Sequence, residues 1–168
     1  MHKTFFDLDQ KEQENLLIKN IEGFCKEKDT FDIEKVKNIQ KIDDYIWVDF
    51  DTVNVYQYKT FLFDMLANPL GEIVYSIYNE KCAFDLFYVD RKYRNQGIGN
   101  LLIYILKNNV YSFYNKKIPI YVTPIVFDVP MSKTIEDDIE HYQKNIERFY
   151  RNNDFIIVED AAESVFLN

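Results

Sequence analysis

Two closely spaced glycines, Gly97 and Gly99, are the feature that most restricts how this chain can fold. The whole chain has only four glycines in 168 residues, so a close pair requires a local reason. The pair follows an apolar stretch ending at Val89 and precedes apolar residues at helical spacing. Glycine leaves the N–H groups of a turn uncovered, and a helix start adds unpaired donors and the positive end of the helix dipole. The pattern predicts a strand, a turn and a helix, in which the turn either binds a phosphate group or binds nothing.

The spacing argues against two common phosphate-binding motifs. A dinucleotide-binding fingerprint needs a third glycine where this chain has Leu102, and its first glycine directly after the strand. Here the polar residues 90–94 intervene. A P-loop needs Gly-Lys followed by Ser or Thr, but Gly99 is followed by Asn100.

Apolar periodicity predicts an α/β chain, with a mixed sheet and helices on its faces. We expect helices over residues 10–28 and 32–40, after the glycine pair to about residue 110, and over residues 135–149. We expect strands over residues 3–8, 45–50, 60–66, 72–78, 82–89, 118–125, 155–158 and 164–167. Short turns join the strands between residues 60 and 89, which indicates antiparallel pairing. No linker rich in Gly, Ser or Pro interrupts the sequence, so we expect a single domain over residues 1–168.

Charge and cysteine content exclude several functions. The chain has 28 acidic and 20 basic residues, a net charge of −8, so it has no general attraction to nucleic acid or anionic lipid. Cys25 and Cys82 lie far apart, and His2 and His141 add no metal-ligand spacing. We expect no metal site, and reduced thiols in a cytoplasmic protein. The N-terminus lacks the apolar core of a signal peptide and no apolar run is as long as a membrane span, so no membrane partner is expected.

The segment Arg94-Asn95-Gln96-Gly97-Ile98-Gly99 resembles the acetyl-CoA signature of the GNAT superfamily of N-acetyltransferases, Gln/Arg-x-x-Gly-x-Gly/Ala, at every fixed position. The segment from Phe149 to Phe155 is similar to the family's aromatic-Tyr pair followed by x-x-x-Gly-Phe, with Asp154 in place of the glycine. The resemblance covers residues 60–160. It implies a GNAT-type fold, a mixed and mostly antiparallel central sheet flanked by helices. Two central strands would splay apart around Val89 and Ile120 to admit the pantetheine arm.

The resemblance also implies where acetyl-CoA binds. Backbone N–H groups from Gln96 to Asn100 would hold the pyrophosphate, and Arg94 would lie near the nucleotide end. The strand edge at Phe87–Val89 would pair with the pantetheine arm through its main chain. The cofactor-binding residues expected are therefore Phe87, Tyr88, Val89, Arg94, Asn95, Gln96, Gly97, Ile98, Gly99 and Asn100.

Two side chains are candidates for catalysis. Tyr150 matches the family tyrosine that protonates the departing CoA thiolate, a transfer that suits a phenol with a pKa of about 10; its alternative is a core aromatic. Asp85 stands where relatives often place a catalytic carboxylate; its alternative is a hydrogen-bonded edge residue.

The turn after Tyr150 departs from the family pattern, because Asp154 stands in place of the glycine. This loss suggests that Asn153 or Asp154 takes the left-handed conformation, which Asn and Asp tolerate.

The acidic residues around the first strands leave two interpretations open. The carboxylates could attract a cationic acceptor amine, or they could form a solvated face. These residues are Asp43, Asp44, Asp49 and Asp51.

The function predicted is transfer of acetyl from acetyl-CoA to a primary amine by direct attack. Neither cysteine is placed as a nucleophile, so no acyl-enzyme is expected. Two alternatives stay open: a CoA-binding or interaction module that keeps the fold without turnover, and a transferase that uses a longer acyl-CoA. The acceptor is not determined, and the resemblance leaves a homodimer open.

Overall fold

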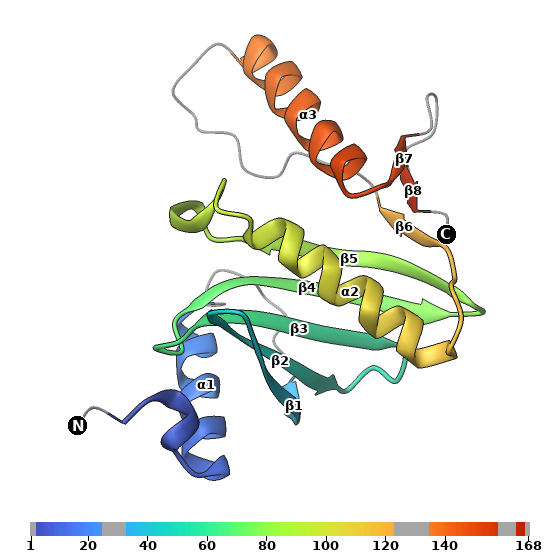
Figure 1. Cartoon of the computed structure of the whole chain (residues 1–168). Coiled ribbons are helices and arrows are strands. Elements are labelled where there is room, and N and C mark those ends of the chain that lie inside the picture. Colours follow the sequence, from blue (N-terminus) through green and yellow to red (C-terminus); the bar gives the residue numbers. More distant parts are fainter. Residues whose placement is uncertain (1–2, 25–32, 123–134, 158–163, 167–168) are drawn as a thin grey trace. The chain divides into compact units, whose positions relative to one another are not determined.

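The computed structural model describes residues 3–24, 33–122, 135–157 and 164–166 (Figure 1). The chain forms two compact units: residues 1–76 with 85–106, and residues 77–84 with 107–168. Strands β4 (Pro69–Tyr78) and β5 (Lys81–Val89) and helix α2 (Ile98–Tyr114) contribute to both units. That the units form a single domain over residues 1–168 stays a prediction.

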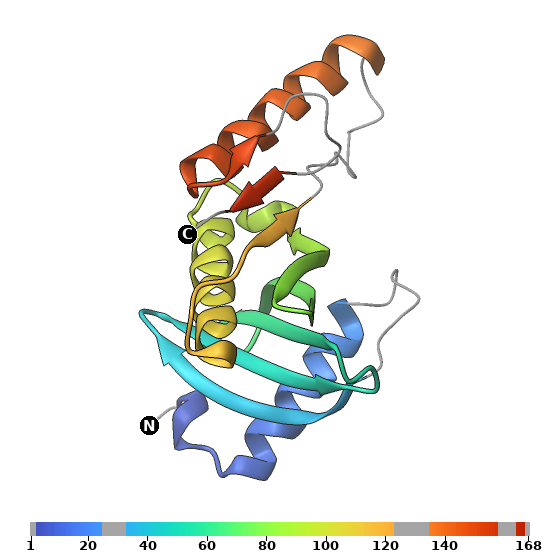
Figure 2. The same cartoon turned by 90° about the vertical axis from the view of Figure 1, so that its right-hand side faces the viewer.

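The first unit is a sheet between two helices. Strands β1 (Ile33–Ile42), β2 (Tyr45–Thr52), β3 (Gln57–Asp64) and β4 pair antiparallel in this order, and β5 follows β4. Helix α1 (Gln10–Phe24) covers one face and the first part of α2 covers the other (Figure 2). The strands expected at 45–50, 60–66, 72–78 and 82–89 all fall on observed strands.

The core under α1 is built by strand alternation. Inward-facing positions on β2 and β3 bring apolar side chains together with those of the helix. The fully buried members are Leu17, Ile21, Ile46, Val48, Phe50, Phe61, Phe63 and Ala67. The rings of Phe50 and Phe61 meet edge to face with centroids 5.4 Å apart. We call the side of the sheet that packs against α1 the α1 face.

Helix α1 begins at Gln10, where the sequence predicts a helix to begin. The Glu12 N–H donates to Asp9 Oδ1 at 2.9 Å and the Asp9 N–H donates to Glu12 Oε2 at 3.1 Å, the reciprocal cap that is typical of an acidic residue followed three positions later by Glu. The strand expected over residues 3–8 is wrong, because Phe5–Asp7 is a short 3₁₀ helix, η1. The Thr4 N–H donates to the Asp7 carboxylate at 2.7 Å and closes this turn.

The helix expected over residues 32–40 is also wrong, because this segment is strand β1. Its apolar side chains recur every third residue, which is typical of a helix. The β1–β2 register shifts between Ile33 and Lys35 and again between Val36 and Asn38. Each shift changes the phase of alternation, so Val36 pairs with Phe50, Ile39 pairs with Val48, and both pack on the core.

The second unit contains the first residues of β5, and three further strands of the described chain belong to it. Strand β6 (Ile120–Val122) pairs parallel with β5 at Cys82 and Ala83, and β8 (Ser164–Phe166) pairs antiparallel with β6 and with β7 (Ile156–Ile157). Helix α3 (Ile135–Asn152) precedes β7. The strand expected over 118–125 is described only to Val122. Residues 127–134, residues 159–163, Cys25 and His2 lie outside the described residues.

Within the part of the chain that the structure describes, no helix is long and apolar enough to cross a membrane.

Candidate functional site

The turn between β5 and α2 has the shape that the glycine pair predicts. A 3₁₀ helix, η2 (Arg91–Tyr93), follows Asp90, whose carboxylate accepts the Lys92 N–H at 2.9 Å. Asn95 and Gly97 then take positive φ values of 61° and 84°. A Cβ on Gly97 would meet nothing within 4 Å, so the conformation and not the space requires glycine here.

Helix α2 begins directly after this turn. Its first hydrogen bond runs from the Leu101 N–H to the Gly97 carbonyl at 3.0 Å. Residues 94–97 are exposed, whereas Ile98 is only 3% exposed and anchors the helix start in the core. Since the first N–H groups of a helix have no partner within it, an accessible turn on an anchored helix start is suited to an anion.

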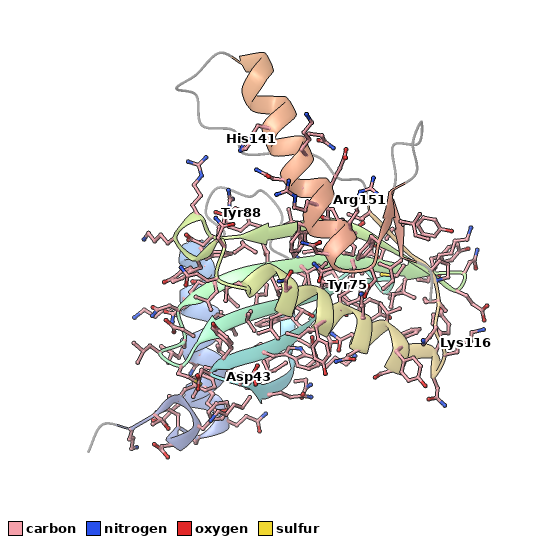
Figure 3. All side chains as sticks on the ribbon, turned by 45° about the horizontal axis from the view of Figure 1, so that its top comes forward. Asp43, Tyr75, Tyr88, Lys116, His141 and Arg151 are labelled. Carbon is pink, nitrogen blue, oxygen red and sulfur yellow. The ribbon has the colours of Figure 1, made fainter. Side chains whose placement is uncertain are left out.

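Arg94 folds back over the end of β5. Its Nε donates to the Val89 carbonyl at 3.0 Å, and its guanidinium lies 5.9 Å from the centre of the Tyr88 ring. Tyr88 lies next to this turn in Figure 3. These contacts link the signature turn to Phe87–Val89, the strand end that sequence analysis assigns to the pantetheine arm.

Strand β5 departs from regular alternation between Asp85 and Tyr88. The Asp85 carboxylate bonds to Gln57, which alternates onto the same α1 face as Phe61. The Tyr88 ring lies 5.6 Å from Phe24 of α1, and Phe24 lies 6.4 Å from Phe61. Side chains three residues apart point to opposite faces of a regular strand. The end of β5 is therefore irregular.

Gly71 on β4 is the residue that accommodates this strand end. A Cβ on Gly71 would stand 2.7 Å from the Tyr88 carbonyl oxygen and 3.0 Å from Leu102 of α2. No side chain fits there. An isolated glycine in a strand is a known signal of close backbone approach.

Asp85 is exposed, and two neighbouring strands hold its carboxylate. Its Oδ2 accepts Gln57 Nε2 of β3 at 3.0 Å and Ser76 Oγ of β4 at 2.5 Å. No pattern along the sequence indicates Gln57 or Ser76, because position 57 meets 76 only through strand pairing, and both meet Asp85 only through hydrogen bonds between strands.

Tyr150 lies near the end of α3 and is 5% exposed. Its ring meets those of Phe149, Phe155 and Phe84, with centroids 5.3, 5.4 and 6.3 Å away. Burial raises the pKa of the Tyr150 phenol above its ordinary value. The phenol therefore keeps its proton at neutral pH.

The turn after Tyr150 replaces the family glycine in the way the sequence predicts. Asp154 has a φ of 67°, in the left-handed region. Lys107 of α2 donates to the Asn153 carbonyl at 2.6 Å and lies 3.7 Å from the Asp154 carboxylate. Its partial burial lowers the pKa of Lys107. The lysine thus satisfies a carbonyl at the end of α3.

The acidic residues of the first strands have different environments. Asp43 is exposed in the β1–β2 turn, where Figure 3 labels it. Asp49 accepts hydrogen bonds from Trp47 Nε1 at 2.9 Å and from Thr60 Oγ1 at 2.6 Å. At least this carboxylate therefore has a role within the sheet. In the described ranges, no group of three or more His, Cys, Asp or Glu side chains could hold a metal.

The predicted site residues fall into two sets. The turn 94–100, the strand end Phe87–Val89 and Asp85 belong to the first unit. Tyr150 belongs to the second unit.

Comparison with known proteins gives structural matches only. No protein-family model matches the chain, and no curated protein matches it. The chain is similar to an aminoglycoside 6′-N-acetyltransferase complexed with coenzyme A, with 17% identity and a TM-score of 0.50, over 67% of this chain and 73% of that one. It also matches a GNAT-family acetyltransferase from Staphylococcus aureus Mu50, with 21% identity and a TM-score of 0.44, over 65% of this chain and 66% of that one. The anti-CRISPR protein AcrVA5 matches with 24% identity and a TM-score of 0.41, over 58% of this chain and 90% of that one.

Proposed function

Because the chain has the fold of the GNAT acetyltransferases, a mixed sheet flanked by helices, we propose that it is an N-acetyltransferase. It transfers acetyl from acetyl-CoA to a primary amine. The observation that carries this proposal is the exposed turn 94–97, which leads into an anchored helix start.

The signature turn holds the pyrophosphate of acetyl-CoA. N–H groups from Gln96 to Asn100 bind the anion at the positive end of α2. The open space around the Cα of Gly97 supports this role, because no side chain obstructs the turn. Arg94 stays near the nucleotide end, and the main chain of Phe87–Val89 pairs with the pantetheine arm.

The reaction proceeds by direct attack. The amine nitrogen forms a C–N bond to the thioester carbon, the C–S bond breaks, and Asp85 receives the proton that the amine loses. Tyr150 gives its proton to the CoA thiolate, for which its protonated phenol is suited. Cys82 is fully buried, which supports transfer without an acyl-enzyme. An acetylated Cys25 or Cys82 that survives a quench would contradict direct transfer from acetyl-CoA to the amine.

The charge of the chain favours a cationic acceptor. At a net charge of −8, long-range attraction draws in an ammonium group and disfavours nucleic acid. We place the protein in the cytoplasm, where its thiols stay reduced, and without a resident metal.

Calorimetric titration of acetyl-CoA into the protein tests the cofactor site. We expect micromolar binding by the wild type and none by Gly97→Glu, because a carboxylate in the turn repels the pyrophosphate. Gly97→Ala is the matched control, since it places a Cβ at the same φ of 84° and adds no charge. No binding by the wild type would overturn the proposal.

A turnover assay then separates an enzyme from a CoA-binding module that lacks activity. The near-complete burial of Tyr150 is the observation that favours the module. The assay supplies acetyl-CoA with spermidine, kanamycin or a lysine-containing peptide. An enzyme turns over at least one amine, and Tyr150→Phe slows it by about 100-fold, the scale of general acid catalysis, without loss of acetyl-CoA binding. Binding without turnover of any amine would instead identify the module.

A further inference from the structure

Two polar side chains on neighbouring strands fix the orientation of the Asp85 carboxylate. Gln57 on β3 and Ser76 on β4 are paired positions, and both donate to Asp85 on β5. The Ser76 bond, at 2.5 Å, has the length of a charge-assisted bond between a hydroxyl and a carboxylate. The three side chains form a polar row across three strands of the first unit.

Both donors bind the same carboxylate oxygen. Gln57 Nε2 and Ser76 Oγ reach Oδ2, and among the described residues Oδ1 has no hydrogen-bond partner. Two bonds from different strands fix the rotation of the carboxylate, whereas one bond would leave it free to turn. The row therefore presents Oδ1 as an oriented acceptor on an exposed residue.

Gln57 is itself held by its own loop and does not depend on Asp85 for its position. Its N–H donates to the Asn54 carbonyl at 3.1 Å. Its carbonyl accepts the Thr52 hydroxyl at 2.9 Å, and that hydroxyl also lies 2.9 Å from the Asn54 carbonyl. The β2–β3 connection thus holds the backbone of Gln57 through bonds that do not involve Asp85, which suits a positioning residue.

We propose that Gln57 and Ser76 are positioning residues that hold Asp85 with Oδ1 toward the acceptor amine. This inference rests on the proposed function, because it assigns the row to the proton that the amine loses. When the amine forms its C–N bond, an N–H bond breaks and the proton goes to Oδ1. Hydrogen bonds among exposed side chains add little to stability, so the row has a small structural role.

The experiment compares two substitutions of equal shape at Ser76. Ser76→Thr keeps the hydroxyl, and Ser76→Val replaces it with a methyl group. With acetyl-CoA and an amine that the wild type acetylates from the set above, Ser76→Val lowers kcat about tenfold, the scale of one hydrogen bond to a charged group. Ser76→Thr stays within about twofold of the wild type, and neither substitution changes the KM for acetyl-CoA. Gln57→Leu behaves as Ser76→Val does.

A double-mutant cycle with Asp85→Asn decides whether Ser76 acts through Asp85. In the Asp85→Asn background, Ser76→Val causes no further loss of kcat. Equal losses in both backgrounds, or equal kcat for Ser76→Thr and Ser76→Val, would overturn the inference and leave the proposed function standing. A wild type that binds acetyl-CoA but acetylates no amine would overturn both.

Discussion

Tyr150 is the residue whose environment bears most directly on its proposed role. A general acid must carry its proton at working pH and must reach the leaving group. The Tyr150 phenol meets the first requirement with its ordinary pKa. Burial among Phe84, Phe149 and Phe155 raises that pKa further, which makes the phenol a weaker proton donor. Only 5% of the residue is exposed, so the second requirement is met only if the thiolate reaches the phenol oxygen within this aromatic cluster.

The same burial makes the stability of the protein depend on pH in the alkaline range. The unfolded chain releases the Tyr150 proton near pH 10, and the folded protein releases it at higher pH. Between these values the folded state binds more protons, so the free energy of unfolding is intact below about pH 10 and falls above it, by up to about 1.4 kcal/mol per pH unit. We expect Tyr150→Phe to reduce this fall, as measured by urea unfolding at pH 8 and pH 11.

Tyr104→Phe is the control for that measurement, because Tyr104 is 56% exposed. It should leave the alkaline loss of stability unchanged. An equal alkaline loss in the wild type and in Tyr150→Phe would show that the buried phenol is not its source.

At the scale of secondary-structure elements, the contact of β4 with β5 and α2 depends on one missing side chain. A Cβ on Gly71 would stand 2.7 Å from the Tyr88 carbonyl oxygen, a backbone atom that cannot turn away. We expect Gly71→Ala to lower the free energy of unfolding by about 1–3 kcal/mol, the cost of overpacking. Urea unfolding at neutral pH measures it.

Gly97→Ala separates the effect of space from the effect of conformation. A Cβ there meets nothing, but the φ of 84° disfavours alanine. The loss of stability should be about 1 kcal/mol and confined to backbone strain.

The opposite outcome for Gly71 would contradict the first of these two predictions. A Gly71→Ala protein as stable as the wild type would mean that β4 and β5 can separate next to Gly71.

Elements with local signals could be predicted from the sequence. The reciprocal cap of Asp9 and Glu12 predicts the start of α1, and alternation predicts β2. Strand β1 could not be predicted, because its shifts in register against β2 give a strand the spacing of a helix. The Ser76–Asp85 bond could not be predicted either, since it follows from pairing between strands and not from spacing along one strand.

At the scale of the whole molecule, the excess of acidic residues predicts how salt affects catalysis. A net charge of −8 attracts a polycationic acceptor over distances that salt screens. With acetyl-CoA saturating, we expect kcat/KM for an acetylated polycation such as spermidine to fall severalfold between 20 mM and 300 mM NaCl. The kcat at saturating amine should change little. A salt-independent kcat/KM would remove net charge as a factor in acceptor choice.

The GNAT-type fold could be predicted because residues 94–99 resemble the acetyl-CoA signature of that superfamily. The site could be predicted only in part. The left-handed Asp154 follows from a single departure from the family pattern, and the structure confirms it. The partners of Lys107, in contrast, lie more than forty positions further along the chain. No spacing rule connects positions so far apart.

Each unit is built from two separate segments of the chain, and this affects how the chain folds while it is synthesised. The last residue of the first unit is Leu106, so all of its sequence has been made before most of residues 107–168 exist. The second unit needs residues 77–84, which are made early and wait for partners that arrive last. During translation the first unit can fold while the ends of β4 and β5 are still exposed to chaperones. A ribosome stalled far enough beyond residue 106 for the whole first unit to have left the exit tunnel should therefore carry a nascent chain whose first unit already resists proteolysis.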